Sequence, residues 1–253
     1  MIDQPQEPSP GAGRAGGGRL YFRQLQAGRD FAVGDPFATQ MRNFTYLIGD
    51  RGVGEALVVD PAYAVGDLLD ALERDGMRCT GVLATHCHPD HLGGDLMGFE
   101  IEGLAQLLAR VMVPVHVQRE EAFLVEMVTG VGLDDMVAHS SGEVVMAGAV
   151  PVELVHTPGH TPGSQCLHVE GRLVTGDTLF LDGCGRTDLP GGDAGALYES
   201  ITKRLARFGD DTLVYPGHRY SPEPSASLGA TRRHNYVFKL STPEQWMAMF
   251  GDS

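Results

Sequence analysis

The chain has 253 residues, 42% of them hydrophobic and 21% charged, so it can bury one sizeable α/β core, while its net charge of −14 disfavours a nucleic-acid partner. The four cysteines Cys79, Cys87, Cys166 and Cys184 have no CxxC spacing, which fits a reducing cytoplasm better than a disulfide framework. No apolar run approaches the roughly 18 residues of a membrane span and no signal-peptide core is evident, so we expect a cytoplasmic protein without a membrane partner.

The N-terminal part of the chain divides into a tail and a first pair of strands. Residues 1–19 are rich in proline and glycine and have almost no apolar anchors. Burial there cannot offset the entropy of ordering, so we predict a disordered tail followed by a single domain at 20–253. The apolar segments 43–48 and 56–60 predict two paired strands around the glycine-rich turn at 52–54.

The following segments predict an alternation of helices and strands. Apolar residues at i, i+3, i+4 and i+7 over 65–72 indicate a helix. We expect a short buried strand at 81–84, then a second amphipathic helix over 101–111 and a strand at 113–117. Residues 119–142 are interpreted as a helix followed by a loop.

The second half of the chain predicts mostly strands and ends on helices. We expect strands at 144–146, 150–155, 165–169, 173–175 and 212–215, a helix over 197–208, and a last helix that begins at the capping box 242–245. The strands first meander and then alternate with helices, without an internal repeat. This order indicates an α/β protein in which two mixed sheets pack face to face with helices outside.

Three imidazoles and one carboxylate fall within six consecutive positions, in the segment Thr85-His86-Cys87-His88-Pro89-Asp90-His91. Such groups repel one another or lose solvation unless a metal ion gathers them, and imidazole and carboxylate suit zinc, iron or manganese. We expect His86 and His88 to flank a tight turn, while Asp90 and His91 begin the next element and reach a second point nearby. The spacing therefore predicts a metal site with two metals rather than one.

Three later segments each present one further ligand beside a glycine. His160 lies in the loop TPGHTPGS, Asp177 follows Gly176 at the end of a strand, and His218 follows Gly217 at the end of another. Five histidines and two aspartates are enough for two cations. We assign one cation to His86, His88 and His160 and the other to Asp90, His91 and His218, with Asp177 as a bridge.

Together these segments, from about Leu20 to Tyr220, resemble the metallo-β-lactamase fold. They are most similar to its glyoxalase II and persulfide dioxygenase branch, because DGCGRTD at 182–188 follows the GDT segment. The resemblance implies an αββα four-layer sandwich of two mixed sheets with a dinuclear site at one edge. It also implies seven metal ligands: His86, His88, Asp90, His91, His160, Asp177 and His218.

The chemistry of such a site favours hydrolysis of a small thioester of the hydroxyacyl-thiol kind. Water on two divalent cations, zinc by preference and iron or manganese as alternatives, has its pKa lowered to roughly 7 and can attack a carbonyl polarised by the second ion. A thiolate leaves without a strong general acid, because a free thiol has a pKa of about 8.5. We expect Asp90 to act as a catalytic residue that orients the hydroxide.

Two other functions stay open. Two histidines and one aspartate around iron form a facial triad, and the persulfide dioxygenase resemblance assigns that triad to His86, His160 and Asp177. The third hypothesis is a non-catalytic metal-binding or sensor module. The thiol carrier is open as well, because the segment after His218 lacks the extended helical region with which glyoxalase II holds glutathione.

Three residues are candidate contacts to a small-molecule substrate, expected to be a thiol conjugate. The guanidinium of Arg186 fits either a substrate carboxylate or a structural pairing with Asp188. Tyr198 and Tyr220 are the other two candidates. The acyl group and the oligomeric state are left open by the sequence.

Overall fold

The computed structural model describes residues 18–240 and 242–251. Most of the predicted N-terminal tail therefore lies outside the described residues, and the first strand begins at Leu20. In the part of the chain that is described, no helix combines the length and the apolar character that crossing a bilayer requires. The single domain at 20–253 stays a prediction.

The first of two six-stranded sheets has the strand order β1-β2-β3-β4-β7-β8. Its strands are β1 (Leu20–Gln26), β2 (Phe44–Asp50), β3 (Glu55–Val59), β4 (Arg78–Leu83), β7 (Val115–Gln118) and β8 (Met136–His139). Strands β1, β2 and β3 form an antiparallel meander, and β3, β4, β7 and β8 run parallel. The predicted strand pair around residues 52–54 is confirmed, because Asp50 pairs with Glu55.

The second sheet has the strand order β14-β13-β12-β11-β10-β9. Its strands are β9 (Val144–Ala147), β10 (Val150–His156), β11 (Gln165–Val169), β12 (Arg172–Gly176), β13 (Leu213–Pro216) and β14 (Ala226–Ser227). All neighbours are antiparallel except β12 and β13, which run parallel. The five strands expected at 144–146, 150–155, 165–169, 173–175 and 212–215 are all present.

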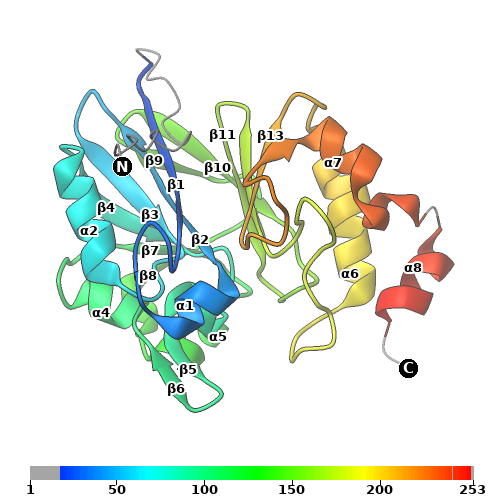
Figure 1. Ribbon diagram of the computed structural model, residues 1–253, viewed down its shortest axis with the longest axis horizontal. Coiled ribbons are helices and arrows are strands. Elements are labelled where there is room, and N and C mark those ends of the chain that lie inside the picture. The colour runs from blue at the N-terminus through cyan, green and yellow to red at the C-terminus, as the bar shows by residue number, and fades with distance from the viewer. Residues whose placement is uncertain (1–17, 241, 252–253) are drawn as a thin grey trace, which may run out of the picture.

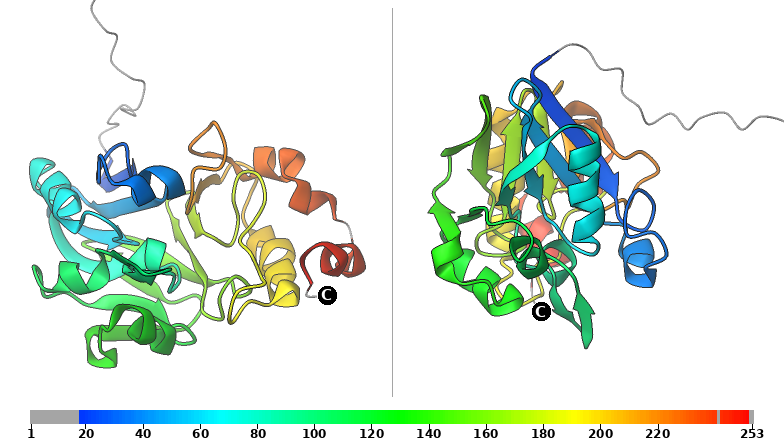
Figure 2. Two further views of the ribbon diagram at one scale, coloured as in Figure 1. Left: turned by 60° about the horizontal axis from the view of Figure 1, so that its bottom comes forward. Right: turned by 90° about the vertical axis from the view of Figure 1, so that its left-hand side faces the viewer.

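Helices cover the outer faces of both sheets, as Figures 1 and 2 show. Those on the first sheet are α2 (Val65–Arg74), α4 (Leu104–Leu108) and α5 (Ala122–Thr129), with α1 (Pro36–Met41) and α3 (Pro89–Leu92) near its edge. Those on the second sheet are α6 (Ala194–Glu199), continued by the short turns η2 (Ser200–Arg204) and η3 (Leu205–Arg207), α7 (Leu228–His234) and α8 (Pro243–Phe250). The predicted αββα sandwich is confirmed.

The period-2 alternation of the strands produces three apolar layers. On β2, Phe44, Tyr46 and Ile48 face the second sheet, whereas Leu47 faces the helices. Residues of the second sheet, such as Leu154 on β10, belong to the same buried cluster. Each such side chain contributes about 1.5–3 kcal/mol when fully buried, so the register of both sheets is set strongly.

The prediction of an amphipathic helix over 101–111 is wrong at both ends, because the helix α4 spans only Leu104–Leu108. A hairpin of β5 (Gly94–Leu96) and β6 (Phe99–Ile101) occupies the region before it. The backbones of Gly93 and Gly103 touch, so that a Cβ on Gly103 would lie 2.5 Å from the Gly93 Cα. The chain crosses itself there, and the helix begins only at Leu104.

Two other differences are short elements with weak sequence signals. The loop expected in the second part of 119–142 contains the edge strand β8, after the turn η1 (Leu133–Asp135), although the expected helix is present as α5. The helix predicted over 197–208 begins earlier, at Ala194, because the Asp193 side chain accepts a hydrogen bond from the Ala196 N–H. The last helix begins as expected, with the Thr242 hydroxyl accepting from the Gln245 N–H.

Candidate metal centre

The HxHxDH segment continues directly from the carboxyl end of β4. His86 is buried there, and His88 has the extended backbone of an N-cap residue. Pro89 takes the first position of α3, where its missing N–H costs nothing. This short helix turns Asp90 and His91 back towards the protein interior, and both are buried.

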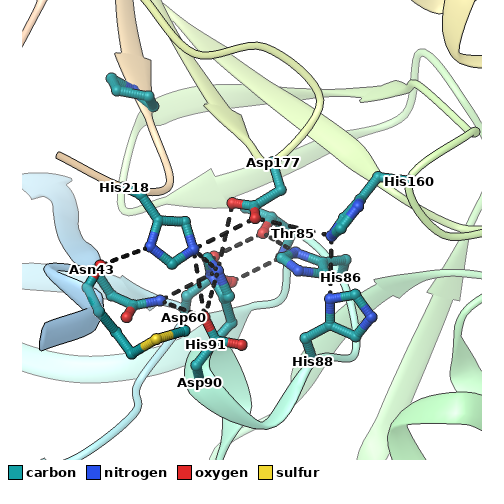
Figure 3. Close-up of polar contacts among 12 residues, drawn as sticks. Asn43, Asp60, Thr85, His86, His88, Asp90, His91, His160, Asp177 and His218 are labelled. Atoms are coloured by element: carbon teal, nitrogen blue, oxygen red, sulfur yellow. Dashed lines mark hydrogen bonds and ion pairs between the residues drawn. The ribbon is translucent and has the colours of Figure 1, made fainter. Parts of the chain in front are cut away.

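His160 meets His86 and His88 to form the first cluster. The Nδ1 atom of His88 lies 3.0 Å from Nε2 of His160. The ring centroid of His86 lies 4.8 Å from the centroids of both other rings. One nitrogen from each of the three residues lies within 4.8 Å of the others, so three imidazoles surround one point (Figure 3).

His218 comes from the end of β13 and meets Asp90 and His91 to form the second cluster. The Nε2 atoms of His91 and His218 are 3.2 Å apart. One carboxylate oxygen of Asp90 lies 3.3 Å from Nε2 of His218 and 3.5 Å from Nε2 of His91. The two clusters therefore match the two ligand groups expected from the sequence.

Asp177 lies between the two clusters at the end of β12. Its Oδ1 lies 3.4 Å from Nε2 of His91, and its Oδ2 lies 3.3 Å from Nε2 of His218. The same Oδ2 lies 3.8 Å from Nε2 of His160, which belongs to the first cluster. The structure thus places the expected bridging carboxylate within reach of both clusters (Figure 3).

Three histidines are oriented by hydrogen bonds on the side away from the clusters. Nδ1 of His218 donates to the Met41 carbonyl at 2.9 Å, and Nδ1 of His160 donates to the Arg186 carbonyl at 2.8 Å. Nδ1 of His91 donates to the carboxylate of Asp60 at 3.0 Å. These acceptors assign the ring proton to Nδ1. Each Nε2 therefore presents its lone pair to the centre, as a metal-binding imidazole does.

A similar arrangement orients His86 through Thr85. The Thr85 hydroxyl donates to Asp60 at 2.6 Å, so its oxygen accepts the Nδ1 proton of His86 at 3.0 Å. Asp60 also accepts from the Thr85 N–H at 2.7 Å. Although Asp60 lies close enough to His86 and His91 to count as a ligand, its oxygens are already engaged, so it supports both histidines from behind.

The residues of both clusters fit two divalent cations. Their nitrogen and oxygen atoms converge on two points, where neighbouring atoms lie 3.0–3.5 Å apart. Among the described residues, Nε2 of His86 and Oδ1 of Asp177 are buried without any hydrogen-bond partner. Buried polar atoms of this kind cost free energy when unpaired, and cations at the two points would satisfy them.

The electrostatics of the two clusters differ. Burial and the neighbouring His160 lower the pKa of His88 to about 4, and burial lowers the pKa of His86 as well. Burial opposes protonation of His91 too, but the carboxylates of Asp90 and Asp177 outweigh it and raise that pKa to about 10. His86 and His88 are therefore neutral at pH 7. The carboxylates beside His91 favour a positive charge there, which a proton supplies in the metal-free centre and a cation would supply instead.

Glycine allows the ligand-bearing strand ends to approach one another. A Cβ on Gly217 would lie 2.2 Å from Oδ1 of Asp177, which is far inside van der Waals contact. Gly176 has a φ of +48°, and a Cβ there would lie 2.7 Å from the hydroxyl of Thr85. Both positions therefore exclude any residue with a side chain.

A buried glutamate that the sequence interpretation missed joins two ligand-bearing loops. Glu121 accepts the N–H of Cys87 at 2.8 Å and the N–H of Gly163 at 2.6 Å. Its side chain is 1% exposed. Cys87 stands between His86 and His88, and Gly163 belongs to the loop of His160, so one carboxylate ties together the three histidines of the first cluster.

The second cluster has a missed support in Asn43. Its amide nitrogen donates to Asp90 at 2.9 Å, and its oxygen accepts from the Tyr63 hydroxyl at 3.0 Å. The only sequence signal was its position at the start of a strand. Asp60 carried a comparable signal, since it follows the strand β3.

The three predicted substrate contacts lie in different surroundings. Arg186 forms a two-point pair with Asp188 at 2.8 and 2.7 Å, which is the structural pairing considered from the sequence. Tyr198 packs against Trp246 beneath α8, in the apolar layer outside the second sheet. Tyr220 stacks on the ring of His218, with centroids 4.8 Å apart, and is 57% exposed. Of the three, Tyr220 touches the centre.

Comparison with known proteins places this arrangement among metal-dependent enzymes. A hydroxyacylglutathione hydrolase of Polaromonas sp. is 40% identical over 183 residues, which cover 71% of this chain and 63% of that protein. The human mitochondrial persulfide dioxygenase ETHE1 is 29% identical over 237 residues, which cover 89% of this chain and 85% of that protein.

Solved structures and a family model agree with these matches. The crystal structure of ETHE1 from Myxococcus xanthus superposes with a TM-score of 0.75 and 29% identity, covering 92% of this chain and 90% of that one. The model of the metallo-beta-lactamase superfamily matches residues 38–218, a range that contains all seven predicted ligands. The chain belongs to the metallo-β-lactamase superfamily.

Proposed function

We propose that this chain hydrolyses small thioesters at a dinuclear metal centre. The observation that carries the proposal is the position of Asp177, whose Oδ2 lies 3.8 Å from His160 of the first cluster and 3.3 Å from His218 of the second. One shared carboxylate and two groups of three ligands suffice for two cations. The similarity to a hydroxyacylglutathione hydrolase supports a thioester as the substrate.

The ligand residues and their supports prepare the site for this reaction. Two divalent cations, held by the two clusters and Asp177, would supply a water of lowered pKa, about 7, and a Lewis acid for the substrate carbonyl. Asp90 is held ionised, because His91 and His218 lower its pKa although its burial opposes this. With one oxygen fixed by Asn43, Asp90 orients the attacking water and accepts a hydrogen bond from it.

The nature of the leaving group explains why the site needs no strong general acid. A thiol with a pKa of about 8.5 departs as thiolate near neutral pH. The four cysteines of the chain are unpaired, which supports the proposed cytoplasmic location, because a reducing compartment keeps thiols free. The expected substrate is therefore a small acylated thiol.

A persulfide dioxygenase is the second candidate function. Two observations favour it: the human enzyme matches this chain over 89% of its length, and the Myxococcus xanthus structure covers 92% of it. In that case His86, His160 and Asp177 would hold one iron as a facial triad. The remaining four residues of the centre would then have supporting roles.

Metal content and oxygen dependence separate these functions. The chain is purified without added metal, and its metals are counted before any assay. We expect two ions per chain and hydrolysis of an acyl thioester under argon. One iron per chain, with oxygen uptake on a low-molecular-weight persulfide and no anaerobic hydrolysis, would establish the dioxygenase instead. Bound metal without either turnover would favour a sensor.

A further inference from the structure

A hollow of about 520 Å³ opens beside the second cluster. Two arginines line it together with Tyr220: Arg42, which ends α1, and Arg219, which follows the predicted ligand His218. The Arg219 N–H donates to the Arg42 carbonyl at 3.0 Å, so the two segments are joined by their backbones. Segments far apart in the sequence thus bring two guanidinium groups to one place.

The hollow lies next to the metal centre, and the ring of Tyr220 stands between them. The ring of Tyr220 lines the hollow and stacks on His218 with an interplanar angle of 4°. On the other side, Asn43 follows Arg42 in the chain and donates to Asp90. The two arginines therefore lie one aromatic ring away from the second cluster.

The two guanidinium groups are available to a ligand. Arg219 donates to the side-chain oxygen of Gln26 at 3.0 Å and to the Pro222 carbonyl at 2.9 Å, which fix it and leave other N–H groups free. Arg42 is exposed, and its backbone is held at a φ of +56°. Within residues 18–240 and 242–251, no acidic side chain forms an ion pair with either arginine.

A pair of uncompensated arginines is unexpected in a chain with a net charge of −14. Guanidinium groups bind carboxylate and phosphate oxygens through paired N–H donors. They repel a further cation, so the hollow is not a third metal site. The left-handed backbone of Arg42 is a strained conformation for a residue other than glycine.

We propose that this hollow binds an anionic group of the substrate, a carboxylate or a phosphate carried at a distance from the thioester carbonyl. The proposal rests on the proposed thioester hydrolysis and adds the charge of the substrate to it. Arg42 and Arg219 hold the anion, while Tyr220 forms the wall between the hollow and His218.

A binding experiment tests the hollow without relying on turnover. Inorganic phosphate, and separately acetate, is titrated into the full-length zinc-loaded protein while the Nε–Hε NMR signals of arginines are followed. We expect saturable shifts at Arg42 and Arg219 and none at Arg74, an exposed residue at the end of α2. In Arg42→Gln the affinity for the anion should fall about tenfold. Equal shifts at Arg74, or none at Arg42 and Arg219, would overturn the proposal.

A kinetic experiment identifies the anion that the hollow prefers. Three thioesters share one acyl group, and their thiols carry a carboxylate, a phosphate ester or a neutral amide. For wild type we expect a KM about tenfold lower for the preferred anionic thioester than for the amide, with similar kcat. In Arg42→Gln the ratio of these KM values should approach one, whereas Arg74→Gln should keep the wild-type ratio. A wild-type ratio near one for both anions contradicts the proposal.

The two experiments separate the subsite from the reaction. If wild type hydrolyses none of the thioesters, the proposed function fails, and the phosphate titration still decides whether the hollow binds anions. If thioesters are hydrolysed at rates that ignore their charge and phosphate leaves the signals of Arg42 and Arg219 unmoved, the subsite fails and the proposed function stands.

Discussion

The two clusters of the centre use different chemistry to attract a cation. The first, His86, His88 and His160, consists of three imidazoles, and burial favours the neutral state of His86 and His88. The second contains the carboxylate of Asp90 and lies against both oxygens of Asp177. A cation in the second cluster would be attracted by two carboxylates, those of Asp90 and Asp177. A cation in the first cluster would be attracted by the carboxylate of Asp177 alone. The clusters should therefore differ in affinity for a cation, although each contains three candidate ligands.

The largest effect should follow from removing the charge that both clusters share. In Asp177→Asn we expect the metal content to fall below two ions per chain and the hydrolytic rate to fall about 10³-fold. Elemental analysis and a thioester assay measure the two quantities. Asp182→Asn, an exposed change in the following loop, is the matched control and should keep both metals. An Asp177→Asn protein that keeps two ions and full activity would show that Asp177 does not bridge the two cations.

Weakening each cluster in turn tests the difference in affinity. His88→Ala should leave one ion in the carboxylate-rich cluster, and His218→Ala should leave one in the imidazole cluster. Because the second cluster has one more negative charge, the ion that remains in His88→Ala should resist about tenfold more chelator than the ion in His218→Ala. A chelator titration followed by metal analysis gives both midpoints. The reverse order would show that charge does not set the affinities.

Glu121 is a support of the first cluster only, so its removal should act on one side. Replacing one carboxylate oxygen by an amide NH₂ in Glu121→Gln leaves a backbone N–H without an acceptor. The free energy of unfolding should fall by about 1–3 kcal/mol, and any metal that is lost should come from the first cluster. Denaturant unfolding measures the first effect, and Glu120→Gln, at the exposed neighbouring position, is the control. Equal stability of the two variants would contradict the role of Glu121.

The smallest effect concerns a histidine pair outside the clusters. Burial and the neighbouring His139 lower the pKa of His116 to about 4 from its ordinary value of 6.5. Between pH 6.5 and pH 4 the imidazole of His116 is protonated in the unfolded chain but neutral in the folded chain. The free energy of unfolding is therefore highest above pH 6.5 and declines as the pH falls towards 4. His116→Gln should show a shallower loss of stability over that range in denaturant titrations, with metal content unchanged. A parallel decline in both proteins would rule out His116 as its source.

The strongly periodic segments were predictable, and the short ones were not. The alternation at Phe44, Tyr46 and Ile48 and the helical spacing of Val65 to Leu72 reflect burial on one face, which the sequence displays directly. The spacing of Ile101 and Leu104 imitates a helix, but Ile101 is buried from a hairpin instead. The contact of Gly93 with Gly103 that separates the two elements is a tertiary event without a local signal.

In the metal centre, too, residues within a local sequence pattern were predictable and residues outside one were not. The seven proposed ligands could be predicted because histidine and aspartate beside glycine at strand ends form a recognisable pattern. Their supports could not, because Asp60 reaches Thr85 across 25 positions and Glu121 reaches Gly163 across 42. An isolated Asp or Glu has no signature of its own, and only the fold shows which backbone N–H it meets.

The most direct test of the account is anomalous X-ray scattering from crystals of the chain purified without added metal. The account predicts two peaks about 3.5–4 Å apart. One should lie among His86, His88 and His160, the other among Asp90, His91 and His218, with Asp177 between them. A single peak held by His86, His160 and Asp177 alone would contradict the dinuclear centre.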